Sequence, residues 1–290
     1  GSYYLDLTIL FCIGFSAGLF IVPLTTYLQR FSPEQQRARY IATTNILTFL
    51  SMLLSAGVFW LLIEIFNFSI LELFSVMGFI SILAVALAFL LSPYFFVRAG
   101  VWFITTFFYR FRIEGVDRIP REGGALLVAN HVSYIDTFFI MAACEREVRF
   151  LIYEPVYKNP VVKFFCDFVR VIPIRSESNS RSILTALDKV TDAINAGDLV
   201  CVFPEGGLTR TGDLQKIHRG YSYILKNTDA PLIPIAHNGL WGSIFSYYKG
   251  KLFFKIPEKL FKKVTIKIAL PVDKEISTEN LAIEFRKLLS

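Results

Sequence analysis

The hydrophobic pattern divides the chain into an apolar N-terminal part and a C-terminal part in which short β-rich runs alternate with helical segments. Three stretches, 7–29, 40–63 and 73–97, contain no charged residue, and each exceeds twenty residues. As helices they are long enough to cross the hydrocarbon core of a bilayer, which is about 30 Å thick. Helices of a soluble bundle would carry a polar stripe, which these stretches lack. Residues 1–97 are therefore predicted to form three transmembrane helices, and three such stretches exclude a cleaved signal peptide.

Basic residues orient these predicted helices. Arg30, Arg37 and Arg39 lie around the first connection, whereas the second connection, 64–72, has no Lys or Arg. Because cytoplasmic loops carry an excess of Lys and Arg, the first connection is expected in the cytoplasm. The chain after residue 97 is then cytoplasmic as well. We expect a multi-pass protein of the inner (plasma) membrane, of bacterial origin.

Residues 98–112 form the predicted link between the two parts of the chain. Arg98, Arg110 and Arg112 bracket an uncharged aromatic run that is too short to span a bilayer. One interpretation is an interfacial helix, with its aromatic rings at headgroup depth and its arginines toward lipid phosphate. The other is the first buried helix of the domain that follows.

From about residue 111 onward, short β-rich runs alternate with helical segments. Strands are expected at 125–130, 148–152, 169–174, 198–203, 231–236 and 264–270, and helices near 134–143, 157–168, 178–196, 216–227 and 278–289. Several of the strands are continuous apolar runs, which is typical of strands buried on both faces. This alternation predicts an α/β domain with a mostly parallel central sheet in residues 113–290.

Composition and charge agree with this division. Hydrophobic residues make up 54% of the chain and charged residues only 19%, which excludes a disordered or fibrous protein. Residues 1–92 carry a net charge of −1 and residues 93–290 a net charge of +7. A basic C-terminal part suits an anionic partner. A nucleic acid is disfavoured because the basic residues accompany aromatic residues and membrane spans, and the four unpaired cysteines predict no metal site.

The first group of candidate catalytic residues is the segment Asn130-His131-Val-Ser-Tyr-Ile-Asp136, directly after a predicted strand. His131 in the turn and Asp136 in the first turn of the next helix can meet, and Ser133 has capping-box spacing to Asp136. The histidine could then take a proton from an alcohol while the aspartate fixes its tautomer. The alternative is that Asp136 only caps the helix.

A second group, Phe203-Pro-Glu205-Gly206-Gly207-Leu208-Thr-Arg210, also follows a predicted strand. Such loops hold ligands in α/β proteins, and two glycines permit close backbone approach. The alternative is a turn with a solvated Glu. Arg175 and Lys216, each more often a surface charge, could join Arg210 in a phosphate site.

Taken together, these motifs resemble the PlsC-like glycerolipid acyltransferase family over about residues 110–270. The resemblance rests on NHxxxxD, an Arg after a strand, FPEG and a Pro-Ile strand at Pro234. It implies His131 as general base and Asp136 as its partner. It also implies an acceptor site, to which we assign Arg175, Glu205, Gly206, Gly207, Arg210 and Lys216. Many members carry an Arg where this chain has Leu208, so its acceptor preference can differ.

Residues 14–45 resemble the late helices of a major-facilitator transporter, of the lysophospholipid transporter branch. The resemblance rests on Gly14, Gly18 and Pro23 within a helix, followed by Ser-Pro and a basic loop. Transporter helices followed by an acyltransferase domain are similar to the Aas-type fusions, which re-acylate 2-acylglycerophosphoethanolamine. Those fusions continue into an acyl–acyl-carrier-protein synthetase domain, so we expect acyl activation either on a separate protein or on residues that follow Ser290.

The function expected from both resemblances is a membrane-bound O-acyltransferase. It would move an acyl group from acyl carrier protein or coenzyme A to a lysophospholipid, with lysophosphatidylethanolamine as first choice and lysophosphatidic acid as the alternative. No cofactor is implied beyond the thioester donor. A different class of function, a transporter fragment with a lipid-binding domain, would leave the His131–Asp136 spacing unexplained.

Residues 247–263 combine six lysines with aromatic residues. A solvated basic loop over a sheet edge is one interpretation. Lysines near a membrane surface attract anionic headgroups by about 1 kcal/mol each, and aromatic residues settle at the interface. We therefore expect this segment to form a membrane-facing rim beside the acceptor entrance.

Overall fold

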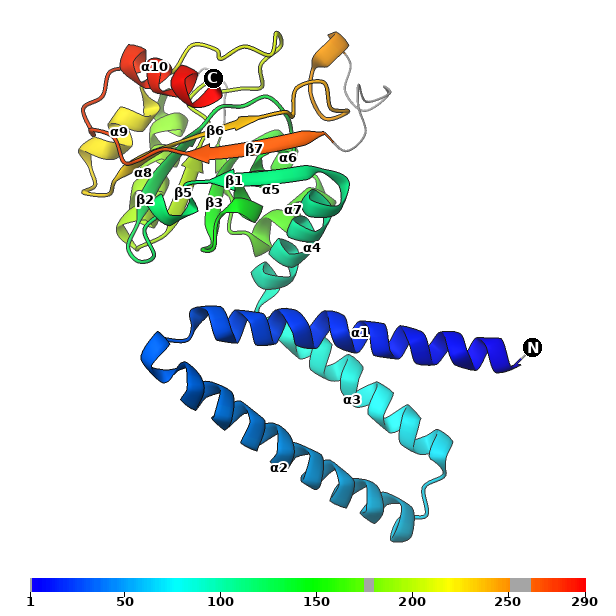
Figure 1. Cartoon of the computed structure of the whole chain (residues 1–290). Helices are drawn as coiled ribbons and strands as arrows, with labels where there is room; N and C mark the ends of the chain where they lie inside the picture. The colour runs from blue at the N-terminus through cyan, green and yellow to red at the C-terminus, as the bar shows by residue number, and fades with distance from the viewer. Residues whose placement is uncertain (1, 175–179, 251–261) are drawn as a thin grey trace. The chain divides into compact units, whose positions relative to one another are not determined.

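The computed structural model describes residues 2–174, 180–250 and 262–290 (Figure 1). The chain divides into two compact units, Gly1–Ala86 and Leu87–Ser290. The first consists of helices, and the second is an α/β domain with a short helical entry.

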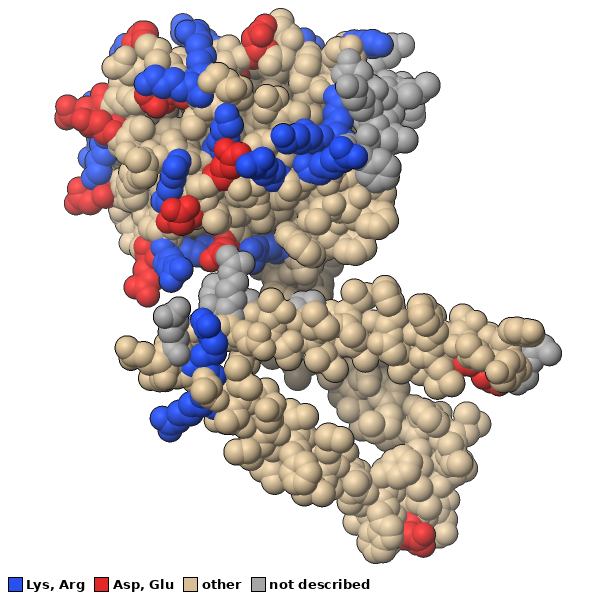
Figure 2. Space-filling view, viewed as in Figure 1, with Lys and Arg blue, Asp and Glu red and all other residues tan. Residues whose placement is uncertain are grey.

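Three long helices account for the first unit and the entry to the second: α1 (Ser2–Phe31), α2 (Arg37–Glu64) and α3 (Ile70–Leu91). Within the described residues, these three are long and apolar enough to cross a membrane. Their large apolar side chains face outward along almost their whole length, and the helix surface is nearly free of charge (Figure 2). Such a contiguous apolar surface is typical of helices that lie in a membrane.

Helix α4 (Pro93–Phe108) follows directly, with Pro93 in its first turn, where a missing N–H costs nothing. One face of α4 packs against the core of the α/β domain and contains Thr105, which is buried. The other face exposes aromatic and aliphatic side chains: Phe95, Trp102, Phe103, Ile104, Phe107 and Phe108. The buried face fits the interpretation of a first buried helix of the domain, and the interfacial role of the exposed apolar face stays a prediction.

The α/β domain is built on one seven-stranded sheet in the order β1-β7-β6-β2-β5-β3-β4. The strands are β1 (Arg110–Glu114), β2 (Ala125–Ala129), β3 (Val148–Tyr153), β4 (Ile172–Ile174), β5 (Leu199–Val202), β6 (Leu232–Asn238) and β7 (Lys263–Ile268). Every pair is parallel except β6 and β7. The mostly parallel sheet predicted from the sequence is therefore confirmed. Five strands, β6 to β4, run in one direction, so their carboxyl ends meet at one edge of the sheet.

Helices cover both faces of this sheet, as Figure 1 shows. On one face, α4 and α5 (Asp136–Ala143) pack on alternate residues of the strands, such as Leu127, Cys201 and Ile235. On the other face, the cover consists of α8 (Ser180–Asn195), α9 (Gly220–Lys226) and α10 (Thr278–Leu289). The short helices α6 (Glu154–Tyr157) and α7 (Pro160–Phe168) connect β3 to β4. This layering buries the central strands on both sides, which explains their continuous apolar sequences.

Three local features depart from the sequence expectation. Residues 110–112 belong to strand β1, not to the helix that was expected to continue to residue 112. The strand forms because Arg110–Glu114 pairs in parallel with β7, a partner about 150 residues later that local pattern cannot indicate. The region near 157–168 contains two helices, and the helix expected from 216 begins at Gly220. By contrast, Gly197, with φ of +97°, follows the end of α8 as predicted.

Candidate functional site

The candidate catalytic residues lie where β2, β5 and β6 end. These three strands are neighbours in the sheet and run in the same direction. Asn130 and His131 follow β2, and Phe203 follows β5. Parallel sheets of α/β proteins bind their ligands outside the carboxyl ends of the strands. The fold therefore brings the two sequence motifs to one place, although they are more than seventy residues apart.

His131 and Asp136 are in direct contact. Nδ1 of His131 lies 2.9 Å from Oδ2 of Asp136. The helix α5 begins at Asp136, so five residues of chain form a loop that returns the carboxylate to the ring. Asp136 also accepts a hydrogen bond from the backbone N–H of Ser133 at 2.9 Å. This is the bond that the capping-box spacing predicts, although Ile135 is the residue that precedes the helix.

The Asp136 carboxylate is fully buried and carries several donors on one oxygen. Besides His131 and Ser133, the backbone N–H of Val132 donates to Oδ2 at 2.7 Å. Burial opposes ionisation of Asp136, but the neighbouring His237 and these hydrogen bonds outweigh it, so the pKa of Asp136 lies below its usual 3.8. Asp136 is therefore a buried anion near neutral pH, able to orient and stabilise a protonated imidazole.

The ring of His131 presents its second nitrogen away from the aspartate. The side chain is 19% exposed, and its ring stacks on Phe203 with centroids 3.9 Å apart. In the described part of the chain, Nε2 has no hydrogen-bond partner. With Nδ1 bonded to Asp136, the free Nε2 can accept a proton from a hydroxyl group.

Glu205 is a buried residue that holds the backbone of this site through hydrogen bonds. It is only 5% exposed, and its two oxygens accept hydrogen bonds from the backbone N–H groups of His131 and Gln215, both at 2.7 Å. Burial raises the pKa of Glu205 above 4.5, and the two backbone donors partly offset this rise. The sequence assigned Glu205 to acceptor binding. What the structure shows is a carboxylate whose oxygens bond the protein backbone.

Thr209 makes the second connection between the two motifs. Its backbone N–H donates to the carbonyl oxygen of His131 at 3.0 Å. The loop after β5 thus bonds His131 on both sides of its peptide backbone. Gly206, with φ of +73°, allows the turn between these contacts. Gly206 and Gly207 are exposed at the surface of this loop, where the sequence placed an acceptor contact.

Arg210 lies beside two tyrosines of neighbouring loops. Its guanidinium is 4.7 Å from the centroid of the Tyr247 ring, and the hydroxyls of Tyr247 and Tyr134 are 3.3 Å apart. Burial and the contact with Tyr247 raise the pKa of Tyr134 to about 12, so this hydroxyl remains neutral. Since Tyr134 follows His131 by three residues, the cluster places a cation near the proposed base. Lys216 is exposed, and Arg175 lies outside the described residues.

A second histidine, which sequence reasoning set aside as structural, also reaches the aspartate. Nε2 of His237 on β6 is 3.3 Å from Oδ2 of Asp136 and 2.6 Å from the carbonyl oxygen of Asn130. Within the described residues, Nδ1 of His237 and Oδ1 of Asp136 are buried without partners. The Asp136 carboxylate raises the pKa of His237 above 6.5, against the opposing effect of burial. The spacing of the motifs gave no signal for this contact.

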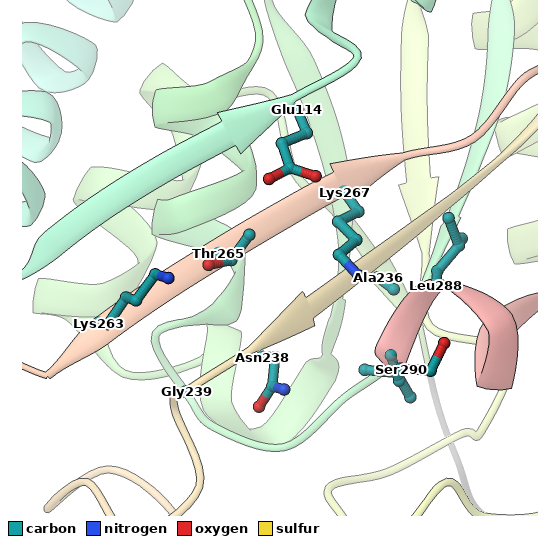
Figure 3. Close-up of a pocket in the computed structure, with 10 residues that line it drawn as sticks. Glu114, Ala236, Asn238, Gly239, Lys263, Thr265, Lys267, Leu288 and Ser290 are labelled. Carbon is teal, nitrogen blue, oxygen red and sulfur yellow. The ribbon is translucent and has the colours of Figure 1, made fainter.

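A separate hollow of about 310 Å³ lies on the other side of β6 (Figure 3). Ala236 and Asn238 line it, and His237 between them points to the opposite face because strand side chains alternate. Charged side chains of β1 and β7 complete the hollow: Glu114, Lys263 and Lys267. Basic side chains gather over this edge of the sheet (Figure 2). The hollow does not contain the His131–Asp136 pair. Most of the predicted membrane-facing rim, residues 251–261, lies outside the described residues.

The family comparison matches this domain. Residues 110–238 match the protein-family model described as Acyltransferase. The matched segment runs from β1 to the end of β6 and includes the His131–Asp136 pair, Glu205 and His237. Residues 110–238 are thus similar to acyltransferase domains, the class that the sequence motifs indicated.

Individual relatives agree at low sequence identity. The chain is 24% identical over 133 residues to a chloroplast 1-acyl-sn-glycerol-3-phosphate acyltransferase of Arabidopsis thaliana, covering 46% of this chain and 37% of the relative. It is 30% identical over 130 residues to the 1-acyl-sn-glycerol-3-phosphate acyltransferase of Pseudomonas aeruginosa, covering 44% and 49%. The chain thus spans less than half the length of either relative. The crystal structure of PlsC from Thermotoga maritima aligns at 22% identity with a TM-score of 0.49, covering 68% of this chain and 76% of that one.

Proposed function

We propose that this protein transfers an acyl group from a thioester to the hydroxyl of a lysophospholipid. The observation that carries the proposal is the contact of His131 Nδ1 with the buried Asp136 carboxylate, which leaves Nε2 as the unbonded nitrogen of the His131 ring. The acyltransferase family of residues 110–238 supplies the reaction class.

The proposed reaction uses His131 first as a base and then as an acid. Nε2 removes the proton of the acceptor hydroxyl while its oxygen attacks the thioester carbonyl carbon. The resulting tetrahedral intermediate expels the thiolate, which takes the proton back from His131. An ester bond forms and a thioester bond breaks, so neither redox chemistry nor a covalent acyl-enzyme is needed. Asp136 stabilises the imidazolium between the two steps.

The acceptor is proposed to be an anionic lysolipid, with 1-acylglycerol 3-phosphate ahead of lysophosphatidylethanolamine. The names of the relatives favour the first. Arg210 provides a guanidinium near the base, which suits a phosphate. Leu208 favours the second, because it stands where many members of the family carry an Arg. The donor is proposed to be acyl carrier protein or coenzyme A thioester.

The membrane is proposed to be the source of the acceptor. Three helices long enough to span it precede the domain, and α4 exposes aromatic side chains directly before β1. We propose that residues 1–97 anchor the protein, that residues 98–112 include the interfacial part of α4, and that the α/β domain faces the cytoplasm. The kinship of residues 14–45 with lysophospholipid transporters stays a prediction.

The decisive experiment measures thioester consumption by the full chain in nanodiscs. Acyl-coenzyme A and acyl carrier protein thioesters would each be supplied with a panel of lysolipids, and free thiol and diacyl product would be measured. We expect thiol release that depends on lysolipid and disappears in His131→Ala. Lysolipid binding without thioester consumption for either donor would contradict the proposal and favour a lipid-binding domain of a transporter.

A further inference from the structure

His237 is a titratable residue of the site, and the proposed reaction does not use it. The residue is 1% exposed, so neither an acceptor nor a donor can reach its ring. Nε2 lies within 2.6 Å of the Asn130 carbonyl oxygen and 3.3 Å of Asp136 Oδ2. Both neighbours accept hydrogen bonds, so Nε2 must carry a hydrogen. The single Nε2–H is therefore shared between the Asn130 carbonyl oxygen, which is the shorter contact, and the carboxylate oxygen that His131 also uses.

Asn130 fixes this ring in place. The pairing of β2 with β6 ends at Ala129 and Ile235. Beyond that point the Asn130 side chain continues it: Oδ1 accepts from the backbone N–H of His237 at 2.9 Å, and Nδ2 donates to the His237 carbonyl oxygen at 3.1 Å. These bonds hold the backbone of His237 against the segment that begins the catalytic motif. A buried, fully bonded backbone leaves the ring little freedom to turn away from Asp136.

We propose that His237 is a positioning residue whose Nε2–H holds the Asp136 carboxylate toward His131 and draws part of its negative charge away from that histidine. The catalytic consequence rests on the proposed acyl transfer, whereas the geometry does not. A carboxylate that shares its charge with a second donor attracts a proton onto His131 less strongly. Removing that donor would therefore strengthen the pull of Asp136 on His131.

Few other charges face His237. Asp136 approaches it from the segment after β2, and Glu205 acts on it from the loop after β5. Cys201 on β5 also interacts electrostatically with Asp136, but the thiol stays uncharged because burial raises its pKa well above 9.0. The balance of charge at His131 is therefore set mainly by the carboxylate and by the donor that His237 supplies.

Two substitutions separate the donor from the bulk of the ring. His237→Gln offers an amide N–H near the position of Nε2, and His237→Leu fills the site without a donor. We expect His237→Leu to lower kcat about tenfold while the KM for the acceptor changes little. We expect His237→Gln to keep most of the wild-type kcat. In an Asp136→Asn background, neither substitution should lower the rate further. Equal losses in both backgrounds would show a merely structural role and overturn the proposal.

A second readout does not need turnover. Diethyl pyrocarbonate modifies neutral histidine, and mass spectrometry of the full chain in nanodiscs can follow the His131 peptide against pH, with exposed His218 as internal reference. We expect the half-maximal pH for His131 to rise in His237→Leu, to move less in His237→Gln, and to stay constant for His218. If this shift is observed but the protein transfers no acyl group, the proposed function is refuted and the proposed role of His237 is supported. Transfer without the shift would refute the role of His237 alone.

Discussion

Oε1 of Glu205 accepts a hydrogen bond of 2.7 Å from the backbone N–H of His131, 74 residues earlier in the chain. The second oxygen of the same carboxylate is bonded to the backbone of Gln215. One buried side chain therefore joins the histidine loop to both ends of the loop after β5. In this arrangement Glu205 stabilises the shape of the acceptor loop, and a contact with substrate is not needed to explain its presence.

Replacing Glu205 tests this interpretation through stability. Glu205→Ala leaves two backbone N–H groups without their acceptor, and each buried unpaired group costs about 1–3 kcal/mol. Glu205→Gln retains one acceptor oxygen and should lose about half as much. Denaturant unfolding of the α/β domain in the full chain, followed by tryptophan fluorescence, measures both. If Glu205→Ala has wild-type stability but a higher KM for the acceptor, Glu205 is assigned to substrate binding instead.

The ionisation of Glu205 also has a predictable sign. Its folded-state pKa is raised above 4.5, mainly by burial. The stability that it contributes is therefore complete below pH 4.5 and is lost as pH rises through the folded-state pKa. We expect Glu205→Gln, which cannot ionise, to lose less stability than the wild type between pH 4 and pH 7. An identical pH dependence in the two proteins would contradict the raised pKa.

His131→Ala should abolish transfer without unfolding the domain. The ring is partly exposed and contributes a free Nε2, so its loss removes the base and little packing. The rate should fall by at least about 10²-fold, the usual contribution of a positioned base. His218→Ala, which removes an exposed histidine of the loop after β5, is the matched control and should retain activity. A folded His131→Ala variant with most of its turnover would exclude the mechanism.

Asp136→Asn separates catalysis from helix capping. The amide oxygen of Asn can still accept the backbone bonds of Val132 and Ser133, so the start of α5 should be retained. The negative charge that stabilises the imidazolium is lost, and we expect a rate reduction of at least about 10²-fold. Circular dichroism and turnover, measured on the same preparation, distinguish the two roles. A rate near that of the wild type would support capping alone.

Arg210 is predicted to recognise the acceptor phosphate. Arg210→Lys keeps the charge but loses the planar group that stacks on Tyr247, and Arg210→Ala loses both. We expect the KM for 1-acylglycerol 3-phosphate to rise in both variants, more in Ala, with kcat changed less. Lys216→Ala serves as a comparison, because Lys216 is an exposed cation of the same loop. Unchanged KM in both Arg210 variants would remove this residue from the acceptor site.

The orientation of the spans can be tested by thiol labelling. In a Cys12→Ser background, Gln35→Cys places a thiol between α1 and α2, and Glu64→Cys places one at the end of α2. We expect an impermeant maleimide to label position 64 from outside intact cells and position 35 only after permeabilisation. The reverse pattern would place the α/β domain outside the cytoplasm.

Sequence periodicity was sufficient for most of the fold because the central strands are buried on both faces. Continuous apolar runs such as Ala125–Ala129 and Leu199–Val202 have few alternatives to a covered parallel strand. Strand β1 was missed because its alternating charged and apolar residues directly follow an aromatic helix. Its pairing partner, β7, lies far away in sequence, and local pattern carries no information about it.

The candidate site shows the same limit. His131 and Asp136 could be paired from their spacing, since a turn followed by a helix start brings them together within five residues. The contact of His237 with Asp136 depends on the register of β6 against β2, which nothing in the local sequence of β6 reveals. For the same reason, the sequence could not predict that Glu205 and Thr209 bond the backbone of His131. Long-range hydrogen bonds, rather than motif residues, complete this site.

The distance in sequence between these supports has a consequence for biosynthesis. His131 and Asp136 leave the ribosome almost together, but Glu205 follows 74 residues after His131, and His237 follows Asn130 by 107. A nascent chain therefore carries an unsupported histidine loop until β5 and β6 have been synthesised and have joined β2. Under the proposed acyl transfer, the site becomes competent only when the sheet is complete, so that unfinished chains are expected to be inert toward lysolipid.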